Sequence, residues 1–181
     1  MYDSQQHFHT LYGRGDYAFS CTAQDADGFR AWQAAFRPRL REILGLDRIA
    51  RDLAGYTPRA EQVDEEDMGA HVRQRWVLWV EPTVPLPFIV LMPQGAEGPL
   101  PLVLTPHGHG KNTELYAGVY HDDTEYASMT EGERDIAVQA VREGYIAIAP
   151  TTRGFGATRA AQDKAEDRTH SCRIQLLHDL L

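Results

Sequence analysis

The chain has 181 residues, of which 43% are apolar and 24% are charged, values typical of a globular protein with a sizeable core. Its formal net charge of −8 argues against a nucleic-acid-binding protein, because such proteins usually present a basic face. The two cysteines are too few for a disulfide framework. The sequence shows neither a signal peptide nor the roughly 18 consecutive apolar residues of a membrane span. We therefore expect a cytoplasmic protein that binds no membrane.

The N-terminal part, residues 1–58, is predicted to hold an irregular segment followed by one helix. Residues 1–26 show little hydrophobic periodicity. Asp25 or Asp27 can then cap a helix whose apolar residues recur every three or four positions until Gly45 ends it. We expect this helix to pack on the sheet of the main domain, and a cap over a substrate pocket is the alternative.

The main part, residues 59–181, begins with a predicted antiparallel meander. Three stretches have the composition of strands, at 59–68, 72–81 and 86–92, and short turns separate them. Glycines and prolines then mark residues 93–99 as a loop.

A βαβ unit follows the meander and makes the predicted fold class α/β. Residues 100–105 form a continuously apolar strand, which predicts burial on both faces of the sheet. Residues 131–143 form a predicted helix, for which Thr130 and Glu133 offer a capping box. Residues 145–149 form a second buried strand, and a parallel pair joined by a helix is right-handed almost without exception.

The glycine-rich turn after the first of these strands has a composition that suggests a phosphate-binding loop. That motif requires a glycine five positions before Gly110 and a hydroxyl residue directly after Lys111. Thr105 and Asn112 occupy these two positions instead. The phosphate-loop interpretation is therefore disfavoured.

Histidines in and after the turn suggest a metal site as a second interpretation. His107 and His109 stand two positions apart, and His121 follows with two aspartates beside it. No third ligand stands at a recognised spacing after the pair. We therefore predict no metal and no cofactor.

The third interpretation is an oxyanion hole, meaning backbone N–H groups that bind a developing negative charge. Glycine lacks a Cβ, so a strand end followed by His-Gly-His-Gly lets the backbone approach a ligand closely. Each such donor typically contributes ~3–4 kcal/mol of transition-state stabilisation. A glycine-rich turn that only changes the direction of the chain is an equally good interpretation of the motif alone.

The order of these motifs resembles the N-terminal half of the α/β-hydrolases. The strand and turn Leu-Val-Leu-Thr-Pro-His-Gly-His-Gly, a helix, Gly-Tyr-Ile-Ala-Ile-Ala-Pro and then Arg-Gly-Phe-Gly carry the resemblance over residues 59–160. The sequence looks most like the dienelactone hydrolase and acetyl xylan esterase-like branch. The resemblance implies a three-layer α/β-hydrolase fold, present only in part.

The resemblance also implies roles for individual residues. In this family the turn after the third strand supplies one oxyanion donor. By position, that donor is the backbone N–H of His109, and Gly108 and Gly110 permit the approach. The residues that the resemblance places around the substrate pocket are His107, Arg153, Gly154 and Gly156.

The nucleophile that the resemblance implies is missing from the chain. It should lie in Gly-x-Ser-x-Gly, followed by an acid and a histidine. None of the serines, at positions 4, 20, 128 and 171, has the required glycines. The tail, residues 169–181, is predicted to be a helix with His170 and His178 on its surface.

We therefore expect an N-terminal portion of a serine ester hydrolase, without the half that carries the nucleophile. The substrate would be a small-molecule ester, and the chain alone would be inactive. The missing C-terminal half or a second copy of the chain would be its partner. A non-catalytic interaction module that retains the front half of the fold is the alternative.

Overall fold

The computed structural model describes residues 3–15, 17–109 and 113–174. The chain divides into two compact units, Met1–Ala54 and Gly55–Leu181. The expected division at residue 58, and the packing of the N-terminal helix on the sheet, stay predictions.

The start of the N-terminal unit is helical, which differs from the irregular segment expected for residues 1–26. Helix α1, Ser4–Arg14, begins at the carboxylate of Asp3, which accepts hydrogen bonds from the amides of Gln5 and Gln6. None of its residues is buried within this unit. Its apolar residues Phe8, Leu11 and Tyr12 are exposed and span little more than one turn, so hydrophobic periodicity is weak here and local capping marks the start of the helix.

The one helix expected in this part of the chain is confirmed as α2, Ala26–Ile43. Its N-cap is Asp25, one of the two residues proposed for that role. The helix continues through Pro38. Gly45 adopts a φ of 64°, a left-handed conformation that glycine tolerates, and ends this helical segment before α3, Leu46–Asp52. No helix in the described part of the chain is long and apolar enough to cross a membrane.

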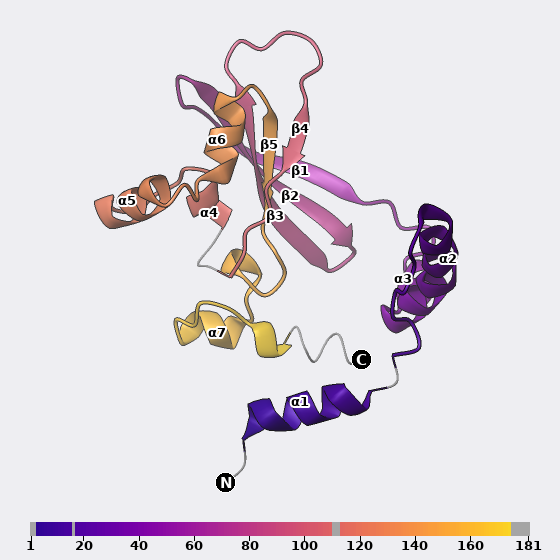
Figure 1. Ribbon diagram of the computed structural model, residues 1–181. Helices are drawn as coiled ribbons and strands as arrows, with labels where there is room; N and C mark the ends of the chain where they lie inside the picture. Colours follow the sequence, from indigo (N-terminus) through magenta and orange to yellow (C-terminus); the bar gives the residue numbers. More distant parts are fainter. Residues whose placement is uncertain (1–2, 16, 110–112, 175–181) are drawn as a thin grey trace. The chain divides into compact units, whose positions relative to one another are not determined.

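The C-terminal unit contains a five-stranded mixed sheet within its described residues, in the order β1-β2-β3-β5-β4 (Figure 1). The expected antiparallel meander is confirmed in β1 to β3, and β4 runs parallel to β5 as expected for a βαβ unit. The antiparallel pairing of β3 with β5 joins the two parts. The strands are β1, Arg59–Asp67; β2, His71–Glu81; β3, Val84–Pro93; β4, Leu102–Leu104; and β5, Ile146–Pro150.

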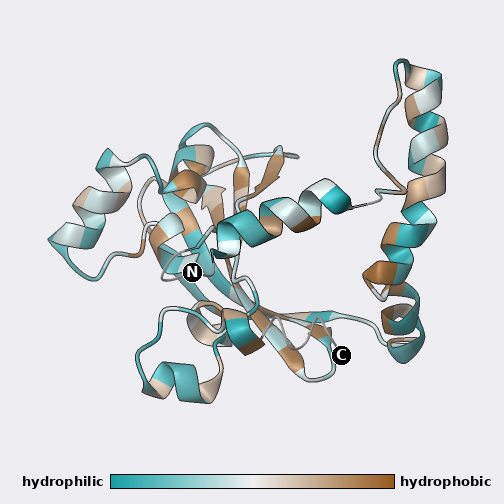
Figure 2. Cartoon of the chain, turned by 60° about the horizontal axis from the view of Figure 1, so that its bottom comes forward, coloured by the Kyte–Doolittle hydropathy of each residue, from teal (hydrophilic) through white to brown (hydrophobic). Residues whose placement is uncertain are grey.

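The core lies where helix α6, Ile136–Arg142, packs against β3 and β5. Leu91 and Ala147 on the strands are fully buried, and Val138 and Val141 on the helix close over them. Hydrophobic residues accordingly lie along the central strands, whereas α5, at the left of the view, is largely hydrophilic (Figure 2).

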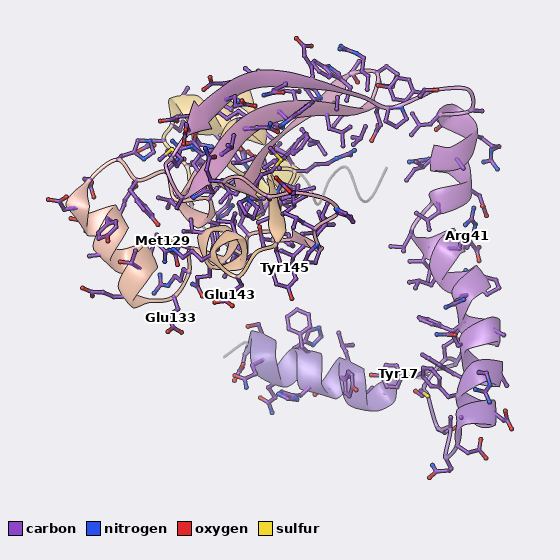
Figure 3. The ribbon with its side chains drawn as sticks, turned by 90° about the horizontal axis from the view of Figure 1, so that it is seen from above. Tyr17, Arg41, Met129, Glu133, Glu143 and Tyr145 are labelled. Carbon is purple, nitrogen blue, oxygen red and sulfur yellow. The ribbon has the colours of Figure 1, made fainter. Side chains whose placement is uncertain are left out.

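The crossover differs from the single helix expected over residues 131–143. It consists of α5, Asp123–Glu131, and α6, separated by a turn in which Glu133 has a φ of 51° (Figure 3). Glu133 therefore cannot act in the expected capping box, and Asp135 is the N-cap of α6. The buried stripe of α6 consists of Ala137, Val138 and Val141.

Strand β4 is less buried than its sequence predicts. The side chains of Leu102 and Leu104 are 56% and 62% exposed, so the expectation of burial on both faces is wrong for this chain. The physical reason is position, because β4 lies at an edge of the sheet and, among the described residues, pairs only with β5. A continuous apolar run is typical of a strand that other elements cover, and the described residues do not cover β4 in this way.

The segment after β5 contains a 3₁₀ turn, η1, Gly156–Thr158, and a short helix α7, Ala161–Ala165. His170 belongs to no helix, contrary to expectation. It forms an isolated antiparallel bridge with Phe155, since tertiary pairing replaces the local helical pattern there. His178 and most of the expected tail helix lie outside the described residues.

Candidate functional site

The carboxyl ends of the two parallel strands bring two turns together. Residues 105–109 follow β4 and residues 151–156 follow β5, and the parallel pairing places both turns at the same edge of the sheet. The amide of Thr105 donates a 2.8 Å hydrogen bond to the carbonyl of Ile148, which extends the pairing into the first turn. Ligands in open α/β sheets bind beyond the carboxyl ends of the strands, so this edge is the candidate site.

His107 joins the two turns through its imidazole ring. The ring is buried, and Nε2 accepts a 3.1 Å hydrogen bond from the backbone N–H of Thr152. Nδ1 lies 2.9 Å from the carbonyl oxygen of Gly108. Because an amide can only donate and a carbonyl can only accept, the ring is the neutral tautomer protonated at Nδ1. His107 thus holds the turn in place and has no free nitrogen for a ligand.

Gly108 presents an open side of the turn. A Cβ built at this position would meet no other atom within 4 Å, and its φ lies outside the left-handed region. Glycine is therefore not required here for packing within the chain. The space beside it is available to a bound molecule, which is the arrangement that close approach to a ligand requires.

His109 combines an available amide with an exposed side chain. Among the described residues, no group accepts a hydrogen bond from its backbone N–H. Its ring stands edge-on to Phe155, with ring centroids 5.4 Å apart. Gly110, the remaining residue of the predicted oxyanion turn, lies outside the described residues.

Two threonines anchor the chain on the far side of this turn. Helix α4, Thr113–Tyr116, begins with a buried hydroxyl that lies 3.0 Å from the hydroxyl of Thr151. The same Thr113 hydroxyl lies 3.2 Å from the carbonyl of Pro150 at the end of β5. The turn is therefore fixed to β5 on both sides, by His107 before it and by Thr113 after it.

The predicted pocket residues of the second turn have different environments. The guanidinium of Arg153 forms an ion pair with Glu81 at the end of β2, which directs its charge toward the protein. Gly154 has a φ of 79°, and its carbonyl accepts a 2.7 Å hydrogen bond from the amide of Ser171. Gly156 begins the 3₁₀ turn.

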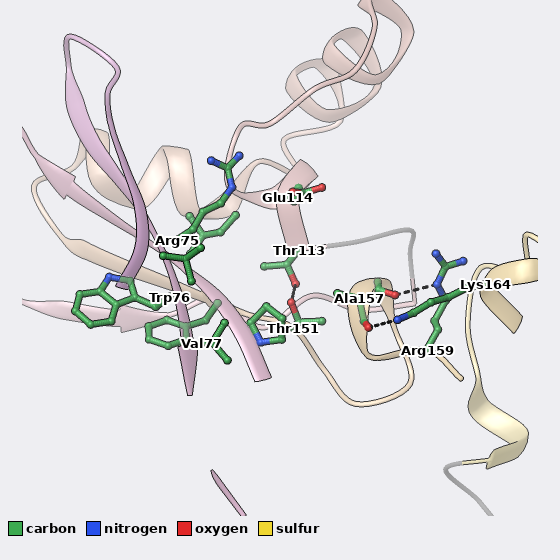
Figure 4. A pocket seen from close by; sticks show the side chains of 14 residues that line it. Arg75, Trp76, Val77, Thr113, Glu114, Thr151, Ala157, Arg159 and Lys164 are labelled. Carbon is green, nitrogen blue, oxygen red and sulfur yellow. Dashed lines mark hydrogen bonds between the residues drawn. The ribbon is translucent and has the colours of Figure 1, made fainter. Parts of the chain in front are cut away.

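A cavity of about 510 Å³ lies beside the second turn (Figure 4). Trp76 and Phe88 contribute apolar walls, and Gly156 is the one predicted pocket residue in its lining. Arg159 and Lys164, also in the lining, donate hydrogen bonds to the carbonyls of η1, Arg159 to Gly156 at 2.9 Å and Lys164 to Ala157 at 2.6 Å. Arg153 and Gly154 line a separate cavity of about 380 Å³, and His107 lies outside both linings.

A buried carboxylate that no sequence motif indicates supports the segment that follows α7. Asp163 is fully buried, and its Oδ1 lies 2.6 Å from a guanidinium nitrogen of Arg173. A hydrogen bond from the Ser171 hydroxyl and the charge of Arg173 hold the pKa of this carboxyl below its usual value, although burial opposes them. Asp163 sits in a short polar helix, where an aspartate usually faces solvent.

The structure also brings two unpredicted residues to His109. The Sγ of Cys172 lies 3.5 Å from Nε2 of His109, and the rings of His109 and His170 have centroids 4.8 Å apart. More than 60 residues separate these partners, so no local motif could indicate their proximity.

Comparison with known proteins places this fold among hydrolases. A family model described as "Abhydrolase family" matches residues 8–177. The fold is similar to that of a Bacteroides fragilis protein described as a candidate acetyl xylan esterase, with a TM-score of 0.68, 21% identity and 94% of this chain covered. It is also similar to the methylesterase BT1017, with a TM-score of 0.51, 17% identity and 84% of this chain covered.

The match covers only part of each solved structure. The chain spans 42% of the first structure and 28% of the second, which is less than half of either. No curated protein sequence matches the chain.

Proposed function

Because this chain belongs to the Abhydrolase family, an α/β-hydrolase family with esterase-like structural neighbours, we propose that it forms the oxyanion-binding part of a serine ester hydrolase. The reaction is the hydrolysis of a carboxylic ester to an acid and an alcohol. The neighbours are named for acetyl and methyl esters, so we propose small esters of this kind as substrates.

The single observation that carries this proposal is the fixed and open turn from His107 to His109. A serine attacking an ester carbonyl creates a negatively charged oxygen, and a preorganised N–H stabilises that charge without rearrangement. The amide of His109 has no acceptor among the described residues, and the side of Gly108 is open. The bond between His107 and Thr152 holds the turn against the end of β5.

The nucleophile, the acid and the base of this proposed enzyme lie outside the chain. Ser171 is buried, and its oxygen accepts a 2.8 Å hydrogen bond from the amide of Ala160, so it serves the packing of its own segment. Neither Ser171 nor the other serines has the Gly-x-Ser-x-Gly context of an exposed nucleophile. The chain by itself therefore supplies half of a site.

The first experiment measures hydrolysis of p-nitrophenyl acetate by the purified chain and by the product of the complete reading frame that contains it. We expect no turnover above buffer from the chain alone. The complete product should hydrolyse the ester, and a serine-directed sulfonyl fluoride should abolish this activity. Hydrolysis by the chain alone that the same inhibitor abolishes would show that the nucleophile was wrongly placed outside it.

The second experiment tests the oxyanion turn in the complete product. The substitution Gly108→Ala places a methyl group in the open space and should lower kcat by about 10²–10³-fold, the usual effect of losing one oxyanion donor. The substitution His109→Ala keeps the backbone N–H and should have a much smaller effect. Equal losses from both substitutions would contradict the role of the amide.

An interaction module without catalysis is the second candidate, and the exposed edge strand favours it. Leu102 and Leu104 present apolar surface on β4, where a partner strand could pair. The complete reading frame discriminates the two candidates. A frame that continues into Gly-x-Ser-x-Gly, then an acid and a late histidine, supports the esterase, whereas a stop codon after Leu181 supports the module.

A further inference from the structure

Three side chains from two distant segments converge at the exposed face of the turn. His109, His170 and Cys172 each place one potential ligand atom so that all three atoms lie within 4.8 Å of one another. The Cys172 Sγ lies 3.5 Å from the His109 Nε2. The three residues belong to the same compact unit.

The second segment is held in place by the residue between the two new side chains. The amide of Ser171 donates to the carbonyl of Gly154, and its hydroxyl oxygen accepts from the amide of Ala160, at 2.7 Å and 2.8 Å. The neighbouring His170 pairs with Phe155 in an antiparallel bridge. Ser171 is buried, whereas the side chains on either side of it, His170 and Cys172, are only partly buried and both lie beside His109.

Further contacts fix both ends of this arrangement. Arg173, next to the cysteine, is bound by the buried carboxylate of Asp163 at 2.6 Å. The ring of Phe155 lies beside both imidazoles, with centroid distances of 5.4 Å to His109 and 6.1 Å to His170. The side chains therefore meet on a supported surface, which is what a preformed ligand set requires.

We propose that His109, His170 and Cys172 form a zinc site. Tetrahedral zinc with bonds of about 2.0–2.3 Å to nitrogen and sulfur places its ligand atoms about 3.3–3.6 Å apart. The ligand atoms of His109 and Cys172 already have this spacing. Rotation of the His170 side chain brings its ring nitrogen to the same distance from the other two ligand atoms, starting from within 4.8 Å. On binding, the thiol of Cys172 loses its proton to solvent and the thiolate binds the metal.

The hydrogen bonding of the free site is compatible with this chemistry. Nδ1 of His170 accepts a long, 3.4 Å hydrogen bond from the amide of Cys172, so this nitrogen has a lone pair that a metal can take in its place. A set of two imidazoles and one thiolate suits zinc and excludes calcium and magnesium, which require oxygen ligands. Three protein ligands leave a fourth position for water or another small ligand.

The pairing explains why the sequence predicts no metal here. His109 has a histidine two positions before it, but both nitrogens of His107 are engaged within the protein. The actual partners are His170 and Cys172, which follow 61 and 63 residues later. The proposal does not depend on ester hydrolysis, since the site is formed by residues of this chain alone.

The test is metal binding by the chain after removal of any affinity tag and of bound metal by a chelator. We expect one equivalent of Zn²⁺ per chain with a Kd below about 1 μM. Co²⁺, used as a spectroscopic probe, should give a thiolate-to-cobalt charge-transfer band and the visible bands of a tetrahedral site. Absence of Zn²⁺ binding by the wild-type chain would overturn the proposal.

Substitution of each ligand locates the site. His109→Ala, His170→Ala and Cys172→Ser should each weaken Zn²⁺ binding by more than about 100-fold, which exceeds the usual effect of losing a supporting residue. Cys21→Ser and His121→Ala are matched controls, because both residues are exposed and neither belongs to the cluster; their affinity should equal that of the wild type. Unchanged affinity in any of the three ligand variants would remove that residue from the site.

A measurement on the wild-type chain keeps the test decisive if a variant fails to fold. Zn²⁺ should slow alkylation of Cys172 by iodoacetamide at least about tenfold, while alkylation of the exposed Cys21 keeps its rate. Equal rates at Cys172 with and without Zn²⁺ would contradict the proposal. This readout is independent of hydrolysis, so failure of the zinc site and failure of the esterase function are distinguishable.

Discussion

The Nε2 atom of His107 accepts a 3.1 Å hydrogen bond from the backbone N–H of Thr152, 45 residues further along the chain. This bond connects the turn after β4 to the turn after β5. The other ring nitrogen of the same histidine bonds to the carbonyl of Gly108. The imidazole therefore acts as a structural bridge that orders the candidate oxyanion turn.

The substitution His107→Ala should lower the free energy of unfolding by about 2–4 kcal/mol, because it removes a buried ring and leaves the Thr152 amide without its acceptor. Urea unfolding followed by tryptophan fluorescence measures this change. His121→Ala, at an exposed histidine that pairs with Glu125, should change it by less than about 0.5 kcal/mol. Equal effects from both variants would show that the His107 bridge contributes nothing.

Substitution by alanine should affect stability differently at two glycines of the site. Gly154→Ala should cost about 1–2 kcal/mol of stability, since its φ of 79° is unfavourable for a residue with a Cβ. Gly108→Ala should leave stability within about 0.5 kcal/mol, because its Cβ meets nothing and its φ is ordinary. Urea unfolding of both variants checks this, and a large loss at Gly108 would mean that this glycine serves folding instead of ligand approach.

The buried carboxylate of Asp163 should make the C-terminal unit sensitive to acid. Its pKa is lowered in the folded state, chiefly by the Ser171 hydroxyl, so its contribution to stability is complete above the unfolded pKa of about 3.9. That contribution is lost as the pH falls through the still lower folded pKa. Thermal unfolding midpoints measured from pH 7 to pH 3 should therefore fall steeply at the acidic end.

Asp163→Asn isolates this effect. The variant should unfold at least about 5 °C lower than the wild type at pH 7, and its midpoint should depend less on pH below about 4. Asp167→Asn, at an exposed position in the same segment, is the control and should follow the wild-type curve. A wild-type pH profile in Asp163→Asn would contradict the assigned cause.

The exposed leucines of β4 should promote self-association of the chain. Leu104→Lys introduces a charge on the open edge and should shift the chain toward monomer in sedimentation velocity at a concentration where the wild type associates. Val63→Lys makes the same change at an equally exposed residue of β1, the opposite edge, among charged neighbours, and should not shift it. A wild-type chain that remains monomeric at every concentration would contradict the prediction.

Local patterns were sufficient to predict most of the elements. The meander, the parallel pair and the cap of α2 at Asp25 follow from short-range rules of alternation, apolar runs and side-chain capping, and the structure confirms them. The sequence also indicated the turn after β4 as the candidate site, because a strand end followed by alternating glycines is a local signal. The helix α1 has only a weak signal of this kind, since its apolar residues span little more than one turn.

Tertiary structure alone decided what each histidine near the turn can do. The sequence places His107 and His109 two residues apart, with nothing in the motif to show what either imidazole ring contacts. Folding buries the first between two turns and leaves the second exposed beside Cys172, because the partners of each ring come from segments more than 40 residues away. Periodicity and motif spacing describe only neighbours along the chain, so the bridge to Thr152 and the proposed zinc ligands could be found only once the sheet had brought these segments together.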